Sequence, residues 1–148
     1  MSDRIEVVSF EDAKIDIQKI RHQVFQQEQG VEPELDFDGL DNLTPHFLAY
    51  RQGQPVGTAR LRSLDAPGLE RHSVKLERMA VLSAYRGQGI GRELLQAAIA
   101  FAHSQGIAEI RLNAQTYAKA FYQKLGFEPY GSEFQEAGIS HIAMKKHL

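Results

Sequence analysis

The chain has 148 residues, a formal net charge of −2 and no cysteine. Its length fits one domain, residues 1–148, whose core needs no disulfide or metal for stability. The small negative charge provides no basic field for nucleic acid or an anionic membrane. The lack of cysteine excludes disulfides, thiolate metal sites and a thiol nucleophile, and the six histidines have no metal-binding spacing. The N-terminal residues include no apolar segment as long as a signal peptide or membrane span, so we expect a cytoplasmic protein.

The first part of the chain predicts a strand over residues 4–10 and then an amphipathic helix. Ser9 followed by Asp12 is typical of a capping box at a helix start. The helix is predicted to reach about residue 28, because apolar residues recur at steps of three and four: Ala13, Ile17, Ile20 and Val24. Residues 30–46 contain glycine, proline and acidic residues without a period, which predicts a loop.

The remaining elements are predicted from alternation, helical periods and turn residues. In chain order they are two strands over 47–64 turned around Gln52-Gly53-Gln54, a loop at 65–71, a strand Val74 to Val81, a helix Ile90 to His103 capped by Gly106, a strand over 107–114, a short helix over 116–126 closed by Gly126, and an antiparallel pair over 127–146. This order predicts an α/β or α+β fold with a single mixed, mostly antiparallel sheet flanked by helices.

Three glycines, Gly87, Gly89 and Gly91, stand between a predicted strand and the best predicted helix. A helix N-terminus presents unpaired N–H groups, and glycine lets an anion approach the backbone closely. Arg86 and Arg92 flank the turn, so the segment is interpreted as a pyrophosphate site; a tight turn without a ligand is the alternative. A nucleotide-binding domain is disfavoured, because the lysine of an ATP-type loop and the sixth-position glycine of a dinucleotide fingerprint are both missing.

The segment "LERMAVLSAYRGQGIGRELL" resembles the acetyl-CoA-binding motif of the GNAT superfamily of N-acetyltransferases, with Arg86, Gly89 and Gly91 in register. "LNAQTYAKAFYQKLGF" resembles the second motif of that family, and the two motifs together cover Leu76 to Phe127. "RHQVFQQEQG" and "EAGISHIAM" are similar to the ElaA-like branch. The resemblance implies a GNAT-like acyl-CoA N-acyltransferase fold, with acetyl-CoA as co-substrate and no metal.

The resemblance also implies which residues hold the cofactor. They are Met79, Ala80, Val81, Arg86, Gly87, Gln88, Gly89, Ile90, Gly91, Arg92, Asn113 and Phe121. The strand residues would act through backbone groups, and a free N–H at Val81 would polarise the thioester carbonyl. Asn113 as a strand-end turn residue and Phe121 as a core residue are the structural alternatives.

Three side chains are candidates for proton transfer. Tyr122 matches the tyrosine that many family members use to protonate the departing thiolate, and a phenol is protonated at neutral pH. An ammonium must lose a proton before it attacks, and Glu77 is the leading base because strand alternation places it on the face of Val81. His141 is the second candidate base, since imidazole titrates near neutral pH. Structural roles for Tyr122, Glu77 and His141 stay open.

The predicted function is acetyl transfer from acetyl-CoA to a primary amine by direct attack in a ternary complex. A non-catalytic acyl-CoA-binding or sensor protein on the same fold is the alternative. The acceptor is a small molecule or a peptide, and self-association as a homodimer is left open. Acidic residues near the first helix would attract a cationic acceptor: Glu28, Glu32, Glu34, Asp36, Asp38 and Asp41. A solvated acidic loop is the alternative, and calcium binding is disfavoured because the spacing fails at Asp41 and Phe47.

Overall fold

The computed structural model describes residues 3–65 and 73–148, and its contacts divide the chain into two compact units. The first unit comprises Met1–Arg62 and Leu76–Ala100, and the second comprises Ser63–Lys75 and Phe101–Leu148. The loop predicted at 65–71 lies, apart from Asp65, outside the described residues.

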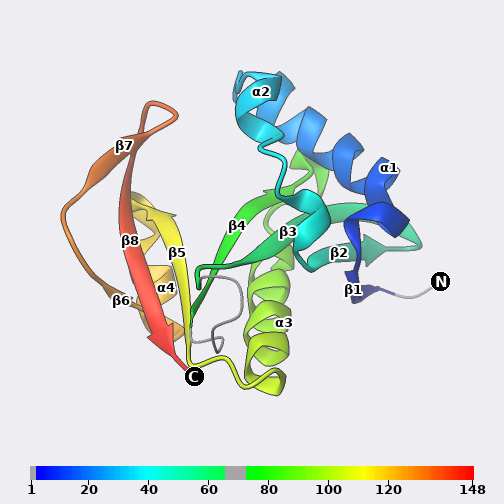
Figure 1. Cartoon of the computed structure of the whole chain (residues 1–148). Helices are drawn as coiled ribbons and strands as arrows, with labels where there is room; N and C mark the ends of the chain where they lie inside the picture. The colour runs from blue at the N-terminus through cyan, green and yellow to red at the C-terminus, as the bar shows by residue number, and fades with distance from the viewer. Residues whose placement is uncertain (1–2, 66–72) are drawn as a thin grey trace. The chain divides into compact units, whose positions relative to one another are not determined.

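The first unit holds the N-terminal strands and helices, drawn from blue to green in Figure 1. Its elements are β1 (Arg4–Val8), α1 (Phe10–Arg21), the π-helical segment η1 (His22–Glu28), the single turn α2 (Pro33–Asp36), the 3₁₀ turn η2 (Asp41–Leu43), β2 (His46–Arg51), β3 (Gln54–Ser63), β4 (Ser73–Val81), the 3₁₀ turn η3 (Ser83–Tyr85) and α3 (Ile90–Ser104). The strands neighbour one another in the order β1, β2, β3, β4, and β4 and α3 each cross the boundary between the units.

Helix α1 begins as predicted, because the Ser9 hydroxyl accepts a hydrogen bond of 3.1 Å from the Asp12 N–H. Its apolar face is buried and continues into η1, with Ile17 and Ile20 of α1 and Val24 of η1 each 3% exposed or less. These residues share a core cluster with Leu48 of β2. The predicted helical span to residue 28 is confirmed, and its last seven residues form the π-helical segment η1.

Helix α3 packs on the opposite face of the same strands. Leu48 pairs with Thr58 across β2 and β3, so the neighbouring Gly57 faces away from α1. A Cβ at Gly57 would lie 3.0 Å from Cγ2 of Ile90 and 3.2 Å from Cδ1 of Leu94. The absence of a side chain at Gly57 therefore lets the first turn of α3 approach the sheet closely.

The hairpin of β2 and β3 is confirmed, and its turn residues Gln52 and Gly53 both have positive φ, at 51° and 78°. Paired left-handed residues match the twist of two-residue hairpins. The segment 30–46 differs from the predicted loop, because it contains α2 and η2. Its carboxylates bind buried arginines, as described below, and such tertiary contacts leave no periodic signal in the sequence.

The second unit contains the C-terminal strands. Its elements are β5 (Glu109–Gln115), the 3₁₀ turn η4 (Thr116–Ala118), α4 (Lys119–Lys124), β6 (Glu128–Pro129), β7 (Phe134–Glu136) and β8 (Ile139–His147). Strand β5 pairs in parallel with the start of β4, from Ser73↔Glu109 to Lys75↔Arg111, whereas β8 pairs antiparallel with β5, β6 and β7. The mixed, mostly antiparallel sheet is thereby confirmed. Gly106 and Gly126, with φ of 73° and 94°, end α3 and α4 as expected.

Candidate functional site

The glycine turn before α3 has a backbone conformation that is compatible with an anion site. Gly87 and Gly89 both have φ of 80°, a left-handed region that side chains disfavour. Nothing lies within 4 Å of a Cβ built at either position, so space beside the turn is open. The Glu93 N–H donates to the Gly89 carbonyl at 3.0 Å, which makes Gly89 the residue before the first helical turn. The first N–H groups of α3 are therefore left without intrahelical acceptors.

The side chains around this turn differ in exposure. Gln88 and Arg92 are exposed, as an anion site requires. Ile90 is 2% exposed and packs beneath Gly57, so only its backbone N–H remains for a ligand. A Cβ at Gly91 would meet only Met79 Sδ, at 3.8 Å. Gly91 therefore keeps the backbone of the first turn accessible.

The end of β4 adjoins the turn through Arg86. The Arg86 Nε donates to the Val81 carbonyl at 2.9 Å, and the Leu82 N–H donates to the Val56 carbonyl at 2.9 Å. Ala80 is 3% exposed and belongs to the core beneath α1, so its side chain is structural. Cofactor contacts through the backbone groups of Met79, Ala80 and Val81 stay predictions.

Glu77 is held by two arginines of β3. Its Oε1 accepts from Arg60 Nη2 at 2.7 Å and from Arg62 Nε at 2.6 Å. Burial raises the pKa of the carboxyl, but the hydrogen bonds from Arg62 and Arg60 outweigh it and hold the pKa below its usual range. A lowered pKa weakens a general base. Arg78, with φ of 54°, also interrupts the regular alternation that placed Glu77 and Val81 on one face.

The arginine contacts extend into the acidic segment. Arg21 Nε and Nη2 donate to Asp36 Oδ1 at 3.0 and 2.8 Å, and Arg21 Nη1 donates to Asp41 Oδ1 at 2.8 Å. Arg60 Nη1 donates to the same oxygen of Asp41 at 3.0 Å and to Asp38 Oδ1 at 2.9 Å. Arg21, Asp36, Asp41 and Arg60 are buried, and together with Asp38 and Glu77 they form one ionic cluster.

This cluster corrects the expectation of a solvated acidic loop. Asp36 and Asp41 are 2% and 6% exposed. Oδ1 of each carboxylate accepts from guanidinium groups, so the charges of Asp36 and Asp41 are compensated within the fold and do not attract an acceptor. Glu32 and Glu34 remain exposed. In the sequence, Arg60 and Arg62 stand two residues apart on one face of a predicted strand. This spacing is a signal from which such a cluster could have been predicted.

We expect the free energy of unfolding to fall on acidification in two ranges. Burial lowers the pKa of His46. Hydrogen bonds, chiefly from Arg60, lower the pKa of Asp38, and the pKa of Glu77 is lowered as described above. A group with a lowered folded pKa stabilises the fold above its unfolded pKa and loses that contribution as the pH falls. The losses should begin below about pH 6.5 for His46 and below about pH 4 for Asp38 and Glu77.

Urea unfolding between pH 3 and 8 measures this dependence. The His46→Gln variant should lack the upper range and keep the lower one. An unfolding free energy that is constant from pH 8 to pH 3 in the wild-type protein would contradict the assignment of these groups.

Tyr122 lies on α4 in the second unit. Its ring makes edge-on contacts with Phe121 and Phe127, with centroids 5.1 and 6.0 Å apart. Burial, with a smaller effect of Tyr117, raises the pKa of the Tyr122 hydroxyl. The phenol therefore stays protonated and can donate. Phe121 is 41% exposed, so the alternative interpretation of Phe121 as a core residue is wrong.

His141 and Asn113 lie on neighbouring strands of the second unit. His141 Nδ1 is 2.7 Å from the Ile139 carbonyl, so Nδ1 carries the proton and Nε2 is the accepting nitrogen of the neutral ring. Nε2 lies 3.7 Å from Glu136 Oε2, and the ring stacks on Phe134 at 5.9 Å. Asn113 pairs with Ala143 inside β5, which continues to Gln115, so it is not a strand-end turn residue.

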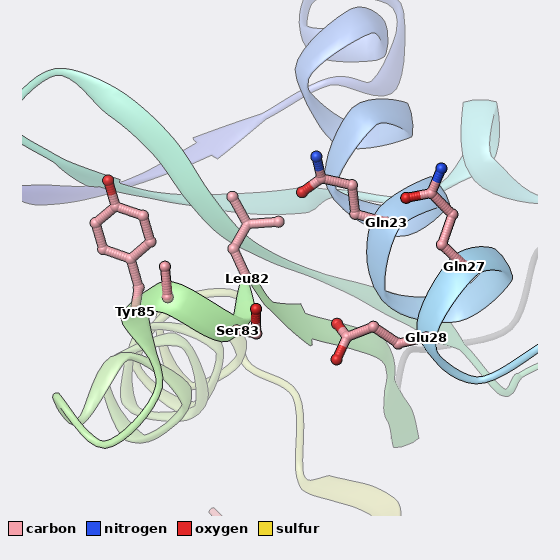
Figure 2. A pocket seen from close by; sticks show the side chains of 7 residues that line it. Gln23, Gln27, Glu28, Leu82, Ser83 and Tyr85 are labelled. Carbon is pink, nitrogen blue, oxygen red and sulfur yellow. The ribbon is translucent and has the colours of Figure 1, made fainter.

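A pocket of about 320 Å³ in the first unit was not predicted from sequence. Figure 2 shows Gln23, Gln27 and Glu28 on one wall and the segment after β4, residues 82–85, on the other. Arg86 donates to both oxygens of Glu28, at 3.0 and 2.7 Å. The two residues are 58 positions apart, which is why no local pattern indicated the pair.

Within residues 3–65 and 73–148, no helix combines the length and apolar composition that crossing a bilayer requires. In the same residues, no group of three or more His, Asp or Glu side chains is placed to hold a metal ion.

Comparisons with known proteins identify the family. The model of the acetyltransferase (GNAT) domain matches residues 12–148. The chain is 38% identical to YjcF, an uncharacterized N-acetyltransferase of Bacillus subtilis, over 86% of this chain and 87% of that protein. It is 31% identical to protein ElaA of Escherichia coli over 88% and 84% of the two chains.

Solved structures agree with the sequence comparisons. An acyl-CoA N-acyltransferase from Pseudomonas aeruginosa matches with a TM-score of 0.83 and 30% identity, covering 98% of this chain and 99% of that one. The crystal structure of Escherichia coli ElaA matches with a TM-score of 0.82 and 25% identity, covering 98% and 99%. The chain therefore belongs to the GNAT family of acyl-CoA-dependent N-acetyltransferases, with ElaA among its relatives.

Proposed function

We propose that this protein transfers an acetyl group from acetyl-CoA to a primary amine by direct attack in a ternary complex. The observation that carries the proposal is the turn from Arg86 to Arg92. It combines two left-handed glycines, open space at their Cβ positions and the N-terminus of a long helix. These features suit a pyrophosphate group. A chain without cysteine forms no thiol acyl-enzyme, which favours direct attack.

The residues of the turn would hold the co-substrate. The N–H groups of Ile90, Gly91 and Arg92 face the anion, and the guanidinium groups of Arg86 and Arg92 add charge-assisted hydrogen bonds. Gly87, Gln88 and Gly89 shape the loop, and Met79, Ala80 and Val81 offer backbone groups. Asn113 and Phe121 are proposed as further contacts. Acetyl-CoA supplies the activated acyl group.

Proton transfer would be carried out by the chain's own side chains. The Tyr122 hydroxyl holds the proton for the departing thiolate, which its raised pKa supports. Nε2 of His141, an accepting nitrogen, and the Glu77 carboxylate are the two proposed acceptors of the amine proton. The lowered pKa of Glu77 favours His141 for this role. A single domain acting in the cytoplasm on a small molecule or a peptide remains the sequence-based expectation.

Binding at the turn predicts a rise in melting temperature with acetyl-CoA. A ligand at one hundred times its Kd stabilises the native state by about 2.7 kcal/mol. The Gly89→Glu variant should lose this rise, because it places a carboxylate and a strained φ at the anion site. Differential scanning fluorimetry with millimolar acetyl-CoA, ATP or NAD measures the effect and its specificity.

The matched control is Gly131→Glu, since Gly131 also has φ of 80° and nothing within 4 Å of a Cβ. It reproduces the backbone strain and the added charge away from the turn. Equal rises in the two variants would show that acetyl-CoA binds elsewhere. Release of CoA with a panel of amines separates an enzyme from a non-catalytic acyl-CoA sensor, which would bind without turnover.

A further inference from the structure

Arg86, assigned above to the pyrophosphate, is already engaged by another anion of this chain. Its Nη1 and Nη2 donate to Oε2 and Oε1 of Glu28, at 3.0 and 2.7 Å. This is a two-point contact of the kind that guanidinium groups also make with phosphates. The Glu28 carboxylate therefore occupies the edge of Arg86 that a phosphate would use.

Two features of the Arg86–Glu28 ion pair favour an exchange of partners. Its side chains are 46% and 38% exposed, and exposed ion pairs contribute little to stability. The third contact of Arg86, from Nε to the Val81 carbonyl at 2.9 Å, belongs to its other edge. That bond can hold the guanidinium at the end of β4 while the outer edge changes from carboxylate to phosphate.

Glu28 also lines the pocket between η1 and residues 82–85. The other side chains of this lining carry amides, hydroxyls or apolar groups, including Gln23, Gln27 and Ser83. In Figure 2 the Glu28 side chain extends from η1 towards the segment that carries Ser83. While Arg86 is bound, the charge of Glu28 is neutralised; once Arg86 turns to phosphate, the pocket holds an uncompensated carboxylate.

We infer that Arg86 exchanges Glu28 for the pyrophosphate when CoA binds, and that the released Glu28 carboxylate then binds a second, non-reacting ammonium group of a cationic acceptor in this pocket. The inference rests on the proposed function. It couples the two substrates, because CoA binding creates the acceptor's counter-charge. The coupling is reciprocal, so a cationic acceptor also favours CoA binding.

The first experiment measures the Kd of CoA by titration calorimetry. Glu28→Gln removes the competing charge and keeps the side-chain shape, so the Kd should fall about two- to fivefold. Glu34→Gln is the control, since Glu34 is exposed on α2 and the substitution makes the same charge change. In an Arg86→Gln background, the Glu28→Gln change should leave the Kd unchanged. An unchanged or higher Kd in the Glu28→Gln single variant overturns the exchange.

The second experiment compares acceptors in steady state at saturating acetyl-CoA. An alkyl diamine keeps one ammonium group when its other nitrogen attacks, whereas an alkyl monoamine does not. Glu28→Gln should raise the KM of diamines about fivefold or more and leave the KM of monoamines unchanged. An equal change for both classes, or none, overturns the assignment of Glu28 to the acceptor.

The outcomes separate this inference from the proposed function. A wild-type protein that binds no CoA contradicts both. A wild-type protein that binds CoA and acetylates amines, with a Glu28→Gln variant indistinguishable from it in both experiments, contradicts the exchange alone.

Discussion

Replacing Tyr122 by phenylalanine is expected to lower kcat by about 10²- to 10⁴-fold, the contribution of a positioned general acid. The substitution removes only the hydroxyl and keeps the ring that contacts Phe121 and Phe127. The Kd of CoA should therefore stay at the wild-type value. The measurement is CoA release with an amine found in the panel, together with calorimetric binding of CoA.

The control is Tyr117→Phe, which removes a hydroxyl from a side chain that is 84% exposed on the adjoining turn η4. Its kcat should match the wild type, although Tyr117 slightly raises the pKa of Tyr122. Because burial raises the pKa of Tyr122, its phenol stays protonated near neutral pH. Ionisation of Tyr122 should therefore cause no change of kcat with pH in this range. Wild-type turnover in the Tyr122→Phe variant would reject the acid role and leave Tyr122 as a packing residue.

Replacing Arg21 by methionine is expected to lower the free energy of unfolding by about 3–5 kcal/mol, the usual effect of breaking a buried ion pair. Arg21 is fully buried and donates to Asp36 and Asp41. Methionine fills a similar volume but leaves these carboxylates without their main cation. Most small domains have 5–15 kcal/mol of stability, so the loss is a large fraction of the total.

Lys14→Met on the same helix is the matched control, because Lys14 is exposed and its substitution also removes a cation. Its unfolding free energy should stay within about 0.5 kcal/mol of the wild type. Guanidinium chloride unfolding with a shared m-value measures both variants. A loss below 1 kcal/mol for Arg21→Met would show that the ionic cluster contributes little to stability.

The ionic cluster determines which acidic residue is suitable for testing the attraction of a cationic acceptor. Substituting Asp36, Asp38 and Asp41 together would break their bonds to Arg21 and Arg60, so any change in KM would reflect altered structure. Glu28 is the acidic residue of this region that lines a pocket and carries a displaceable partner. A charge change there is the sharper experiment.

The sequence by itself determined the elements whose signals are local. The step of three and four from Ile17 to Val24 fixed the buried face of α1, and Ser9 fixed its start. Gly87 and Gly89 indicated a turn before a helix, and both have the positive φ that glycine favours. Such signals depend on backbone sterics and on neighbours within one or two helical turns, so the residues alone carry them.

The tertiary structure decided the partners of the charged groups. Arg21 reaches Asp41 across 20 positions, Arg60 reaches Asp38 across 22, and Arg86 reaches Glu28 across 58. A charged residue has the same letter whether it is solvated or buried in an ion pair, and no period marks its partner. Burial and distance, which set pKa values and ion pairs, exist only once the strands and helices have packed. The sequence therefore predicted an anion site beside Arg86, and the fold determined that Arg86 holds the carboxylate of Glu28.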